Sequence, residues 1–278
     1  MIIVQFMGGL GNQLFQYAIY AKLISMGKKV KADISYYTEK KGRPFKLEDA
    51  FGIQVEEASL EELEHVYGKG KNFLEKLYRK NIQKYVILQE NSIQQIEDIV
   101  CHRNVYIEGF WQSHKWFEDI QEELRSRLNF VSADTQLHKK LEEIEQKNAV
   151  SIHVRMGDYL IGSKIYGGIC TEEYYRKAIE YIKDNVENPY FYVVSDEPEK
   201  AKEMLGNGSD MEYLNSSWED FRDMQIISVC KHHIMANSSF SWWGVWLNKN
   251  ADKIVVAPQK WNNIGYDEDI YDPTWIRI

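Results

Sequence analysis

Short apolar runs alternate with stretches of helical periodicity along the first part of the chain. Residues 2–6, 29–33 and 105–108 are apolar runs of strand length, and such runs predict buried strands. Residues 14–26 carry apolar side chains at helical spacing and predict a helix between the first two strands. Strand, glycine-rich loop, helix and strand in this order are typical of a nucleotide-binding α/β layer. The pattern also predicts a strand at 85–88 and helices at 116–128 and within 132–147.

A second series of the same kind begins at residue 149. Thr171 is expected to cap a helix, and Pro198 suits the first turn of another. Strands that alternate with helices predict a mainly parallel sheet. We therefore expect an α/β protein of two Rossmann-like domains, residues 1–140 and 141–278. The strands predicted in the second domain are 149–154, 190–194, 233–236 and 253–257, with helices at 172–184, 218–231 and 239–247.

Composition narrows the class of protein. The chain has 278 residues, 44% of them hydrophobic, which suffice for two domains with separate cores. The formal net charge of −8 disfavours a nucleic-acid-binding protein, because such proteins are usually basic. Cys101, Cys170 and Cys230 have neither metal-ligand nor disulfide spacing, which is typical of a reduced cytosol. We find no secretory signal and no apolar run near the ~20 residues of a membrane span, so we expect a cytoplasmic protein with at most peripheral membrane association.

An arginine follows directly after the strand predicted at 149–154. Arg155 is unusual at the end of a core strand unless an anion binds there, and ligands of open α/β sheets bind at the carboxyl ends of strands. Its guanidinium can hold two phosphate oxygens at once. Two simpler interpretations stay open. Arg155 could pair with Asp158 only to fix the loop, and His153 could be a core histidine rather than a contact to a base or phosphate.

The loop after the first strand reads Gly-Gly-Leu-Gly-Asn-Gln. Gly9 and Gly11 match two glycines of the dinucleotide-binding fingerprint, but a leucine occupies the place of the third. Asp33 lies near the expected position of the acid that binds ribose. Three interpretations are open: a nicotinamide or flavin site, a tight turn without a ligand, and a backbone site for a sugar or phosphate. In the third case the amides of Asn12 and Gln13 would add hydrogen bonds.

Two further loops carry polar groups after predicted strands. Asp196 can accept hydrogen bonds from ribose hydroxyls or from guanine N–H groups; alternatively, it caps the following helix. Asn237, Ser238, Ser239 and Phe240 lie at a helix start, where hydroxyls and backbone N–H groups form an anion site. The alternative is ordinary capping by Asn237 or Ser238. We interpret the tryptophans of that helix as core residues: Trp242, Trp243 and Trp246.

A metal site has little support in the sequence. Many sugar transferases hold a divalent metal with an Asp-x-Asp triplet at a strand end. Here the triplet is Asp267-Glu268-Asp269, in a polar segment that no strand precedes. His232 and His233 are adjacent, so on a strand they would point to opposite faces. We expect no metal and no other cofactor.

Taken together, these segments resemble one family. Each motif alone is a weak signal, but several in order over nearly the whole chain are a specific one. The chain resembles the bacterial α-1,2-fucosyltransferases, which transfer L-fucose from GDP-L-fucose to a β-galactoside. The motifs are Gly-Gly-Leu-Gly-Asn-Gln-Leu-Phe-Gln at 8–16, His-Val-Arg-x-Gly-Asp-Tyr at 153–159, Thr-x-Glu-Tyr-Tyr at 171–175, Cys-Lys-His at 230–232 and Asn-Ser-Ser-Phe-Ser-Trp-Trp at 237–243.

The resemblance implies a GT-B-like architecture with two Rossmann-like domains facing a cleft, and inversion at the anomeric carbon without a metal. It implies GDP-L-fucose as the donor and a β-galactoside oligosaccharide or glycan as the acceptor. Arg155 would contact the β-phosphate, and Asn12 would face the reaction centre or acceptor; these two are the expected catalytic residues. His153 and Asp196 would address the guanosine. The catalytic base is unassigned, with Asp158 as a weak candidate. The residues expected to bind the donor are Gly9, Gly11, His153, Arg155, Asp196, Asn237, Ser238, Ser239 and Phe240.

The chain departs from the family at one position. Met156 stands where family members commonly carry a second arginine. Strand alternation would direct residue 156 away from the ligand face of Arg155, so we expect GDP binding to survive while donor or acceptor choice differs. Two alternatives follow. The first is a GDP-sugar transferase with another sugar or acceptor in surface polysaccharide synthesis, and the second is a non-catalytic nucleotide- or carbohydrate-binding protein.

Overall fold

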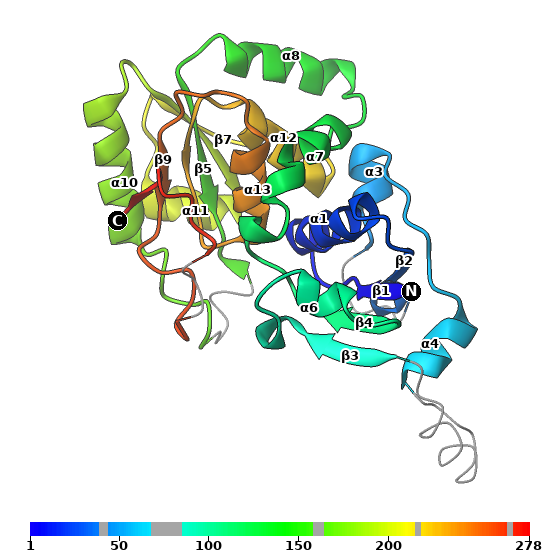
Figure 1. Cartoon of the computed structure of the whole chain (residues 1–278). Helices are drawn as coiled ribbons and strands as arrows, with labels where there is room; N and C mark the ends of the chain where they lie inside the picture. Colours follow the sequence, from blue (N-terminus) through cyan, green and yellow to red (C-terminus); the bar gives the residue numbers. More distant parts are fainter. Residues whose placement is uncertain (39–43, 68–84, 158–163, 215–217, 266–268) are drawn as a thin grey trace. The chain divides into compact units, whose positions relative to one another are not determined.

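The computed structural model describes residues 1–38, 44–67, 85–157, 164–214, 218–265 and 269–278 (Figure 1). The chain divides into two compact units, Met1–Asn129 and Phe130–Ile278. The boundary expected after residue 140 falls within helix α8 (Thr135–Glu145). This helix belongs to the second unit, because Lys140 lies 3.0 Å from Glu212 on another element of that unit.

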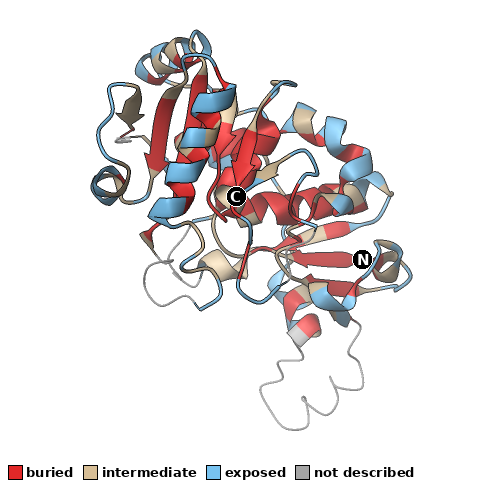
Figure 2. Ribbon diagram, turned by 90° about the vertical axis from the view of Figure 1, so that its left-hand side faces the viewer, coloured by how far each residue is buried: buried red, intermediate tan, exposed pale blue. Residues whose placement is uncertain are grey.

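The first unit contains a four-stranded parallel sheet. Its strands are β1 (Ile2–Gln5), β2 (Val30–Asp33), β3 (Val86–Gln89) and β4 (Val105–Glu108), in the order β2-β1-β4-β3. All four strands predicted in this half are present. The central strand β1 is almost completely buried (Figure 2), which explains its continuous apolar sequence.

Helix α1 (Leu10–Ser25) follows β1 and is buried along most of its length. It begins at Leu10, earlier than the predicted start at residue 14, so the glycine-rich loop contributes the first turn of the helix. The helix predicted at 116–128 is wrong in its first half: two short 3-10 turns, η2 (His114–Trp116) and η3 (Glu118–Ile120), precede α7 (Gln121–Arg127). The described residues of this unit also form α2 (Ser35–Thr38), α3 (Leu47–Phe51), α4 (Leu60–Tyr67), η1 (Glu90–Ser92) and α6 (Glu97–Val100).

The strands of the second unit are β5 (Ala149–Val154), β6 (Tyr190–Ser195), β7 (Met211–Tyr213), β8 (His232–Ile234), β9 (Val255–Ala257) and β10 (Ile276–Arg277). They form a six-stranded parallel sheet in the order β10-β9-β8-β5-β6-β7. The predicted strands are present, although β8 ends at Ile234 rather than residue 236. Two edge strands were not predicted, because they are only three and two residues long and give no readable periodicity.

Helices of the second unit follow the strands as the alternation predicts. Helix α10 (Glu172–Asn185) begins at its predicted cap, since the Thr171 side chain accepts a hydrogen bond from the Tyr174 N–H. Pro198 opens α11 (Pro198–Leu205). Both helices share a hydrophobic core with β5 and β6. The part of this unit that the structure describes also contains α12 (Asp220–Val229) and α13 (Ser239–Leu247).

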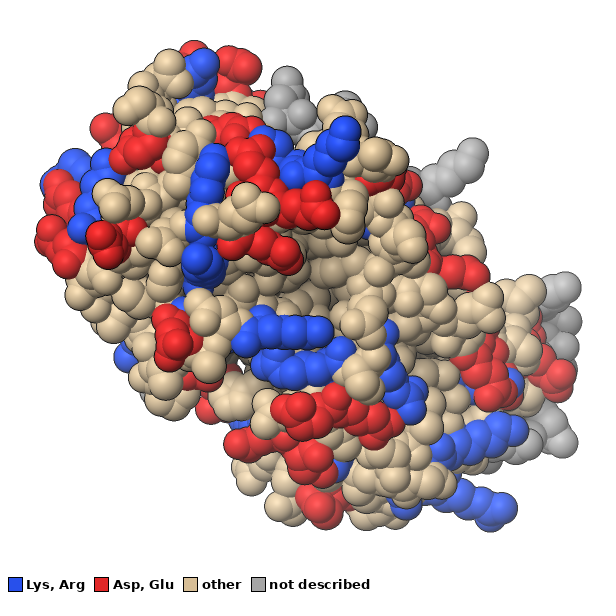
Figure 3. Space-filling model, turned by 90° about the horizontal axis from the view of Figure 1, so that it is seen from above, with Lys and Arg blue, Asp and Glu red and all other residues tan. Residues whose placement is uncertain are grey.

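The surface carries both signs of charge. On the face drawn in Figure 3, acidic and basic side chains lie interspersed, in keeping with a formal net charge of −8. Among the helices of the described residues, none combines the length and the apolar character that a bilayer crossing requires.

Candidate functional site

Three of the predicted motifs meet at one edge of the second sheet. Strand β5 lies between β8 and β6, and both pairings are parallel. The segments that follow these strands therefore emerge side by side at the carboxyl edge, where ligands of open α/β sheets bind. Arg155 follows β5, Asp196 follows β6, and residues 236–240 follow β8 and lead into α13. Segments distant in the sequence thus converge as the strand alternation predicts.

Arg155 is paired with Asp196 at this edge. Nη1 of Arg155 lies 2.9 Å from Oδ2 of Asp196, with side chains 18% and 24% exposed. The same carboxylate accepts hydrogen bonds from the backbone N–H groups of Met156 and Gly157. Asp158, the partner considered from sequence and the weak candidate for the base, lies outside the described residues. The alternative that Asp196 caps the next helix is wrong, because Glu197 is the N-cap residue of α11 and makes no side-chain cap bond.

His153, the fifth residue of β5, is a neutral polar group beside Arg155. Its exposed fraction is 5%. Burial, and next the charge of Arg155, lower the pKa of His153 to about 4. Its Nδ1 is buried without a hydrogen-bond partner among the described residues, and an unsatisfied buried polar atom costs roughly 1–3 kcal/mol. A ligand that supplies this hydrogen bond would recover that cost.

The start of α13 completes the cluster. Ser238 is the N-cap residue, and its hydroxyl accepts a hydrogen bond from the Phe240 N–H at 3.3 Å. The Phe240 ring lies 5.5 Å from the His153 ring, centroid to centroid. A helix N-terminus, a neutral histidine and an arginine on neighbouring strands favour an anionic ligand. Ser239 and Phe240 are half-buried at this edge.

Asn237 has an internal role that the sequence did not reveal. Its side chain donates to the carbonyl oxygens of Tyr166 and Trp261 and accepts from Sγ of Cys170. With an exposed fraction of 1%, the side chain fixes the loop before α13 from within the protein. Any contribution of Asn237 to donor binding would therefore pass through its backbone or through the loop that it positions.

The tryptophans of α13 are core residues, as predicted. Trp242 and Trp243 are 2% and 0% exposed. Their rings pack edge to face, with centroids 5.1 Å apart, and the indole N–H of Trp242 donates to the Ile270 carbonyl at 2.6 Å. They therefore anchor the helix whose first turn faces the candidate site.

Met156 points into the core. It is 8% exposed and belongs to the hydrophobic cluster that includes Val154, Tyr174 and Tyr175. Arg155, in contrast, turns to Asp196. The expected alternation is confirmed: residue 156 lies on the opposite side from the arginine.

The glycine loop of the first unit is fixed by side chains of its own unit. Gly8 has φ of +84°, a conformation that favours glycine, and its carbonyl accepts hydrogen bonds from Gln13 and Tyr37. Gln13 is 0% exposed and also bonds Pro44 and Lys46. The hypothesis that its amide serves a ligand is therefore wrong. Gly9 is the N-cap residue of α1, and Gly11 is buried in the first turn.

Asn12 is the loop residue whose amide remains partly exposed. Its Oδ1 accepts a hydrogen bond from Nε2 of Gln112, on the loop after β4, at 2.9 Å. Asp33 is 1% exposed and bonds the Tyr106 hydroxyl at 2.7 Å and the Ser35 N–H at 2.9 Å. An acid engaged in this way does not suit the ribose contact of a dinucleotide site, so the sugar or phosphate interpretation of the loop gains support.

One carboxylate at the carboxyl edge of the first sheet was not predicted from the sequence motifs. Glu90 follows β3, and its Oε2 accepts a hydrogen bond from the Phe110 N–H at 2.8 Å. Gly109, with φ of +153°, allows this approach, because a Cβ there would lie 2.5 Å from Cβ of Glu90. The available signal was its place directly after a predicted strand. Glu90 thus adds an acid to the carboxyl edge of the first sheet.

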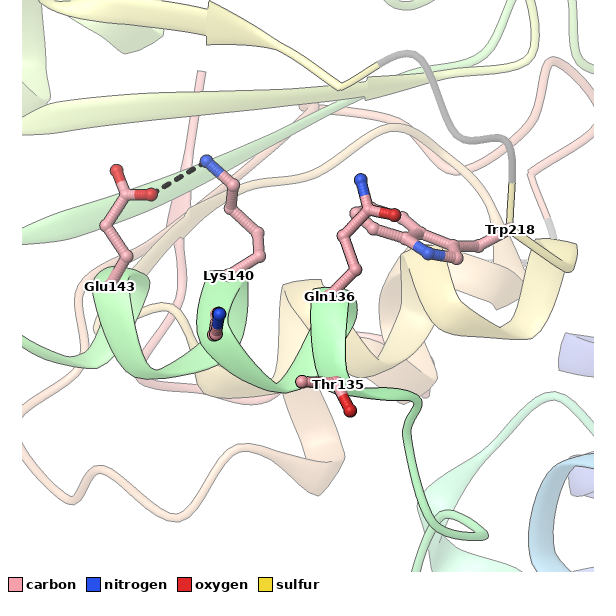
Figure 4. Close-up of a pocket in the computed structure, with 6 residues that line it drawn as sticks. Thr135, Gln136, Lys140, Glu143 and Trp218 are labelled. Carbon is pink, nitrogen blue, oxygen red and sulfur yellow. Dashed lines mark hydrogen bonds and ion pairs between the residues drawn. The ribbon is translucent and has the colours of Figure 1, made fainter.

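A separate pocket of about 410 Å³ lies beside α8 in the second unit. Gln136 and Trp218 lie together at one end of it, and the Lys140–Glu143 ion pair, 2.8 Å long, lies at the other (Figure 4). None of its lining residues was a predicted site residue. Within the described ranges, no three His, Cys, Asp or Glu side chains cluster closely enough to hold a metal ion.

Comparisons with known proteins agree with the motif resemblance. The family model described as glycosyl transferase family 11 matches residues 1–278. An alpha-1,2-colitosyltransferase of Escherichia coli is 30% identical over 100% of this chain and 98% of its own. The O-antigen biosynthesis glycosyltransferase WbnK of Escherichia coli is 28% identical over 98% of each chain. A galactoside alpha-(1,2)-fucosyltransferase 1 of Lagothrix lagotricha is 24% identical over 62% of this chain and 52% of its own.

The fold has a counterpart among solved structures. The crystal structure of fucosyltransferase NodZ from Bradyrhizobium superposes with a TM-score of 0.50 at 12% identity, over 88% of this chain and 92% of that one. This likeness concerns the fold alone. The expected GT-B-like α/β class with two Rossmann-like units is confirmed.

Proposed function

This chain belongs to glycosyl transferase family 11, and from that membership we propose that it transfers L-fucose from GDP-L-fucose to the 2-hydroxyl of a terminal β-galactoside, with inversion and without a metal. One relative is named an alpha-1,2-colitosyltransferase and another a galactoside alpha-(1,2)-fucosyltransferase, and both names support an α-1,2 linkage. The relative named for O-antigen biosynthesis supports a surface polysaccharide as the acceptor.

The observation that carries the proposal is the polar cluster at the carboxyl edge of the second sheet. Arg155, neutral His153 with its unpartnered Nδ1, and the N-terminus of α13 lie on adjoining segments there. A nucleoside diphosphate supplies negative charge for the arginine and the helix, and a hydrogen bond for the histidine. We therefore propose that the GDP moiety binds at this edge. The donor contacts expected of Gly9 and Gly11, and the role of Asn12 toward the acceptor, rest on the family membership.

The first requirement of the proposed reaction is stabilisation of the GDP leaving group. When the bond between fucose C1 and the phosphate oxygen breaks, negative charge develops on the β-phosphate. Preorganised donors lower the barrier most when they face that charge, and Arg155 with the α13 N-terminus would do so. The acceptor hydroxyl must also lose a proton. Asp158 and Glu90 are the carboxylates to test for this step, and Asn12 would orient the acceptor.

Another GDP-sugar is the second candidate donor. Colitose is L-fucose without its 3-hydroxyl, and the relative named for its transfer is 30% identical over the whole chain. Met156 lies in the hydrophobic core rather than at the candidate site, so it does not favour one donor over the other. Turnover of GDP-colitose with a kcat/KM above that of GDP-L-fucose would replace fucose by colitose in the proposal.

The nucleotide is tested by a thermal-shift panel with GDP, GMP, UDP and NAD. A ligand that binds only the native state at 100 times its Kd stabilises it by about 2.7 kcal/mol, so GDP should raise the Tm most. Stabilisation by NAD without GDP would reject the proposal. Release of GDP from GDP-L-fucose that depends on a β-galactoside then tests transfer itself.

A further inference from the structure

The carboxylate of Asp196 contacts three successive residues of the loop after β5. Its Oδ1 accepts a hydrogen bond from the Met156 N–H at 2.9 Å. Its Oδ2 accepts one from the Gly157 N–H at 3.1 Å and lies 2.9 Å from Nη1 of Arg155. The parallel pairing of β5 and β6 brings the two strand ends together. One side chain thus fixes both the arginine and the backbone that follows it.

These contacts of Asp196 are not explained by capping of helix α11, which follows it in the sequence. The N-cap residue of α11 is Glu197, which makes no side-chain cap bond. The Glu197 N–H donates to the Ser195 hydroxyl at 3.1 Å. The carboxylate of Asp196 is therefore directed across the sheet edge to the neighbouring strand rather than into its own helix.

Two neighbours make this arrangement specific. Met156 is anchored in the core cluster at 8% exposure, which fixes the far side of the loop. At Gly157, a Cβ would lie 2.7 Å from Oδ2 of Asp196, closer than carbon and oxygen can pack. A side chain at residue 157 would therefore push the carboxylate away from the loop.

We propose that Asp196 is a positioning residue that holds Arg155 ready for the diphosphate of the donor and does not read the guanine base. Both of its oxygens are engaged by the loop, and hydrogen bonds to charged groups are among the stronger ones. An arginine already ordered loses less conformational entropy when a ligand binds. The inference rests on the proposed function, because it assumes that Arg155 receives a diphosphate.

Nucleotide selectivity distinguishes positioning from reading of the guanine 2-amino group. A contact to the base N1–H, which IDP also carries, is tested by a double-mutant cycle with Arg155. IDP differs from GDP only by the missing 2-amino group of the base. In calorimetric titrations of the full chain, Asp196→Asn should weaken the binding of GDP and of IDP by the same factor, about tenfold or more. The ratio of their Kd values should stay unchanged. A ratio that falls toward one in the variant would show that Asp196 reads the base, and unchanged affinity for both would also overturn the inference.

A double-mutant cycle tests the connection to Arg155. Because Asp196 is proposed to act through the arginine, most of the loss caused by Asp196→Asn should disappear in the Arg155→Ala background. The full loss in both backgrounds would overturn the inference. Glu197→Gln is the matched control, since this neighbouring carboxylate pairs with Lys200, at 3.4 Å on the surface. The GDP affinity of this variant should equal that of the wild type.

Gly157→Ala provides a second route if Asp196→Asn loses its cooperative melting transition. The added methyl should displace the carboxylate of Asp196 and weaken the binding of GDP and IDP equally. Wild-type affinities would contradict the positioning role of Asp196. The outcomes also separate the two proposals. A wild-type chain that binds no GDP refutes the proposed function, whereas a wild type that binds GDP with variants that bind it equally well refutes only the role of Asp196.

Discussion

Arg155 is the residue on which the proposed chemistry depends most. Removing one preorganised donor to a developing negative charge costs roughly 10²–10³ in kcat. We expect Arg155→Ala to lower turnover of GDP-L-fucose by at least that factor while the fold survives, because the side chain lies at the sheet edge, 18% exposed. Steady-state GDP release and circular dichroism measure the two effects.

A matched control for that substitution is Arg176→Ala. Arg176 lies on α10, is more than half exposed, and pairs with Glu180 at 2.9 Å. Exposed pairs of this kind contribute little to stability, so its turnover should match the wild type. Comparable losses in both variants would point to a general effect of arginine removal and would contradict the assigned role.

His153 makes stability depend on pH. Burial, and then Arg155, lower its pKa to about 4, whereas an unfolded histidine titrates near 6.5. Between these values the unfolded state binds a proton that the folded state does not, so stability rises with pH and is lost as pH falls from about 6.5 to 4. We expect the Tm to fall as the pH is lowered through this window, and His153→Gln to reduce the slope of Tm against pH.

His233 contributes in the same direction, because burial also lowers its pKa. Part of the slope should therefore persist in His153→Gln. A slope equal to that of the wild type would contradict the account.

Two helix caps give a comparison at the scale of elements. Ser238 caps α13 at the candidate site, and Thr171 caps α10 through the Tyr174 N–H. Replacing either with alanine should cost about 0.5–2 kcal/mol of unfolding free energy, measurable in urea. Only Ser238→Ala should also lower the affinity for GDP, measured by calorimetry, because only α13 is proposed to face the phosphates. Equal GDP affinities in the two variants would contradict the proposal that the α13 N-terminus contacts the nucleotide.

The elements that the sequence predicts well are those whose periodicity is strong. Strands β4 and β5 and helix α13 have their predicted bounds. The predicted start of α1 was too late because glycine is a poor helix former. In the structure Leu10 is buried at 4% exposure, and the end of the glycine loop forms the first turn of the helix. The helix expected at 116–128 fails at Phe117, whose φ of −141° interrupts it. Tertiary packing decided both boundaries, and local propensity could not reveal it.

The candidate site was predictable where strand order alone decides proximity. Arg155 and Asp196 follow neighbouring parallel strands, and their convergence follows from topology. The partners of individual side chains were not predictable. Asn237 bonds Tyr166 and Trp261, and Gln13 bonds Pro44, residues whose proximity depends on how long loops fold back. Polar residues in a motif can therefore serve the loop rather than the ligand.

At the scale of the whole molecule, the proposed reaction is expected to need no metal ion. Arg155 and the α13 N-terminus would stabilise the leaving diphosphate without a divalent cation. We expect turnover to be unchanged after dialysis against EDTA and after addition of Mg²⁺ or Mn²⁺. The measurement is GDP release from GDP-L-fucose with a β-galactoside acceptor. A loss above tenfold that Mg²⁺ or Mn²⁺ restores would contradict the prediction.

The burial of Met156 bears on how this sequence diverged from relatives with arginine at that position. Met156 shares its cluster with Val154, Tyr174 and Tyr175, and a guanidinium buried there without a partner would be strongly destabilising. Met156→Arg should therefore lower the Tm markedly, and a Tm within 1–2 °C of the wild type, roughly a fraction of a kcal/mol, would contradict this. The two residues are then not interchangeable by one mutation. A chain with arginine at this position would need a differently packed core around it, so residue 156 and its cluster form one coupled unit of the sequence.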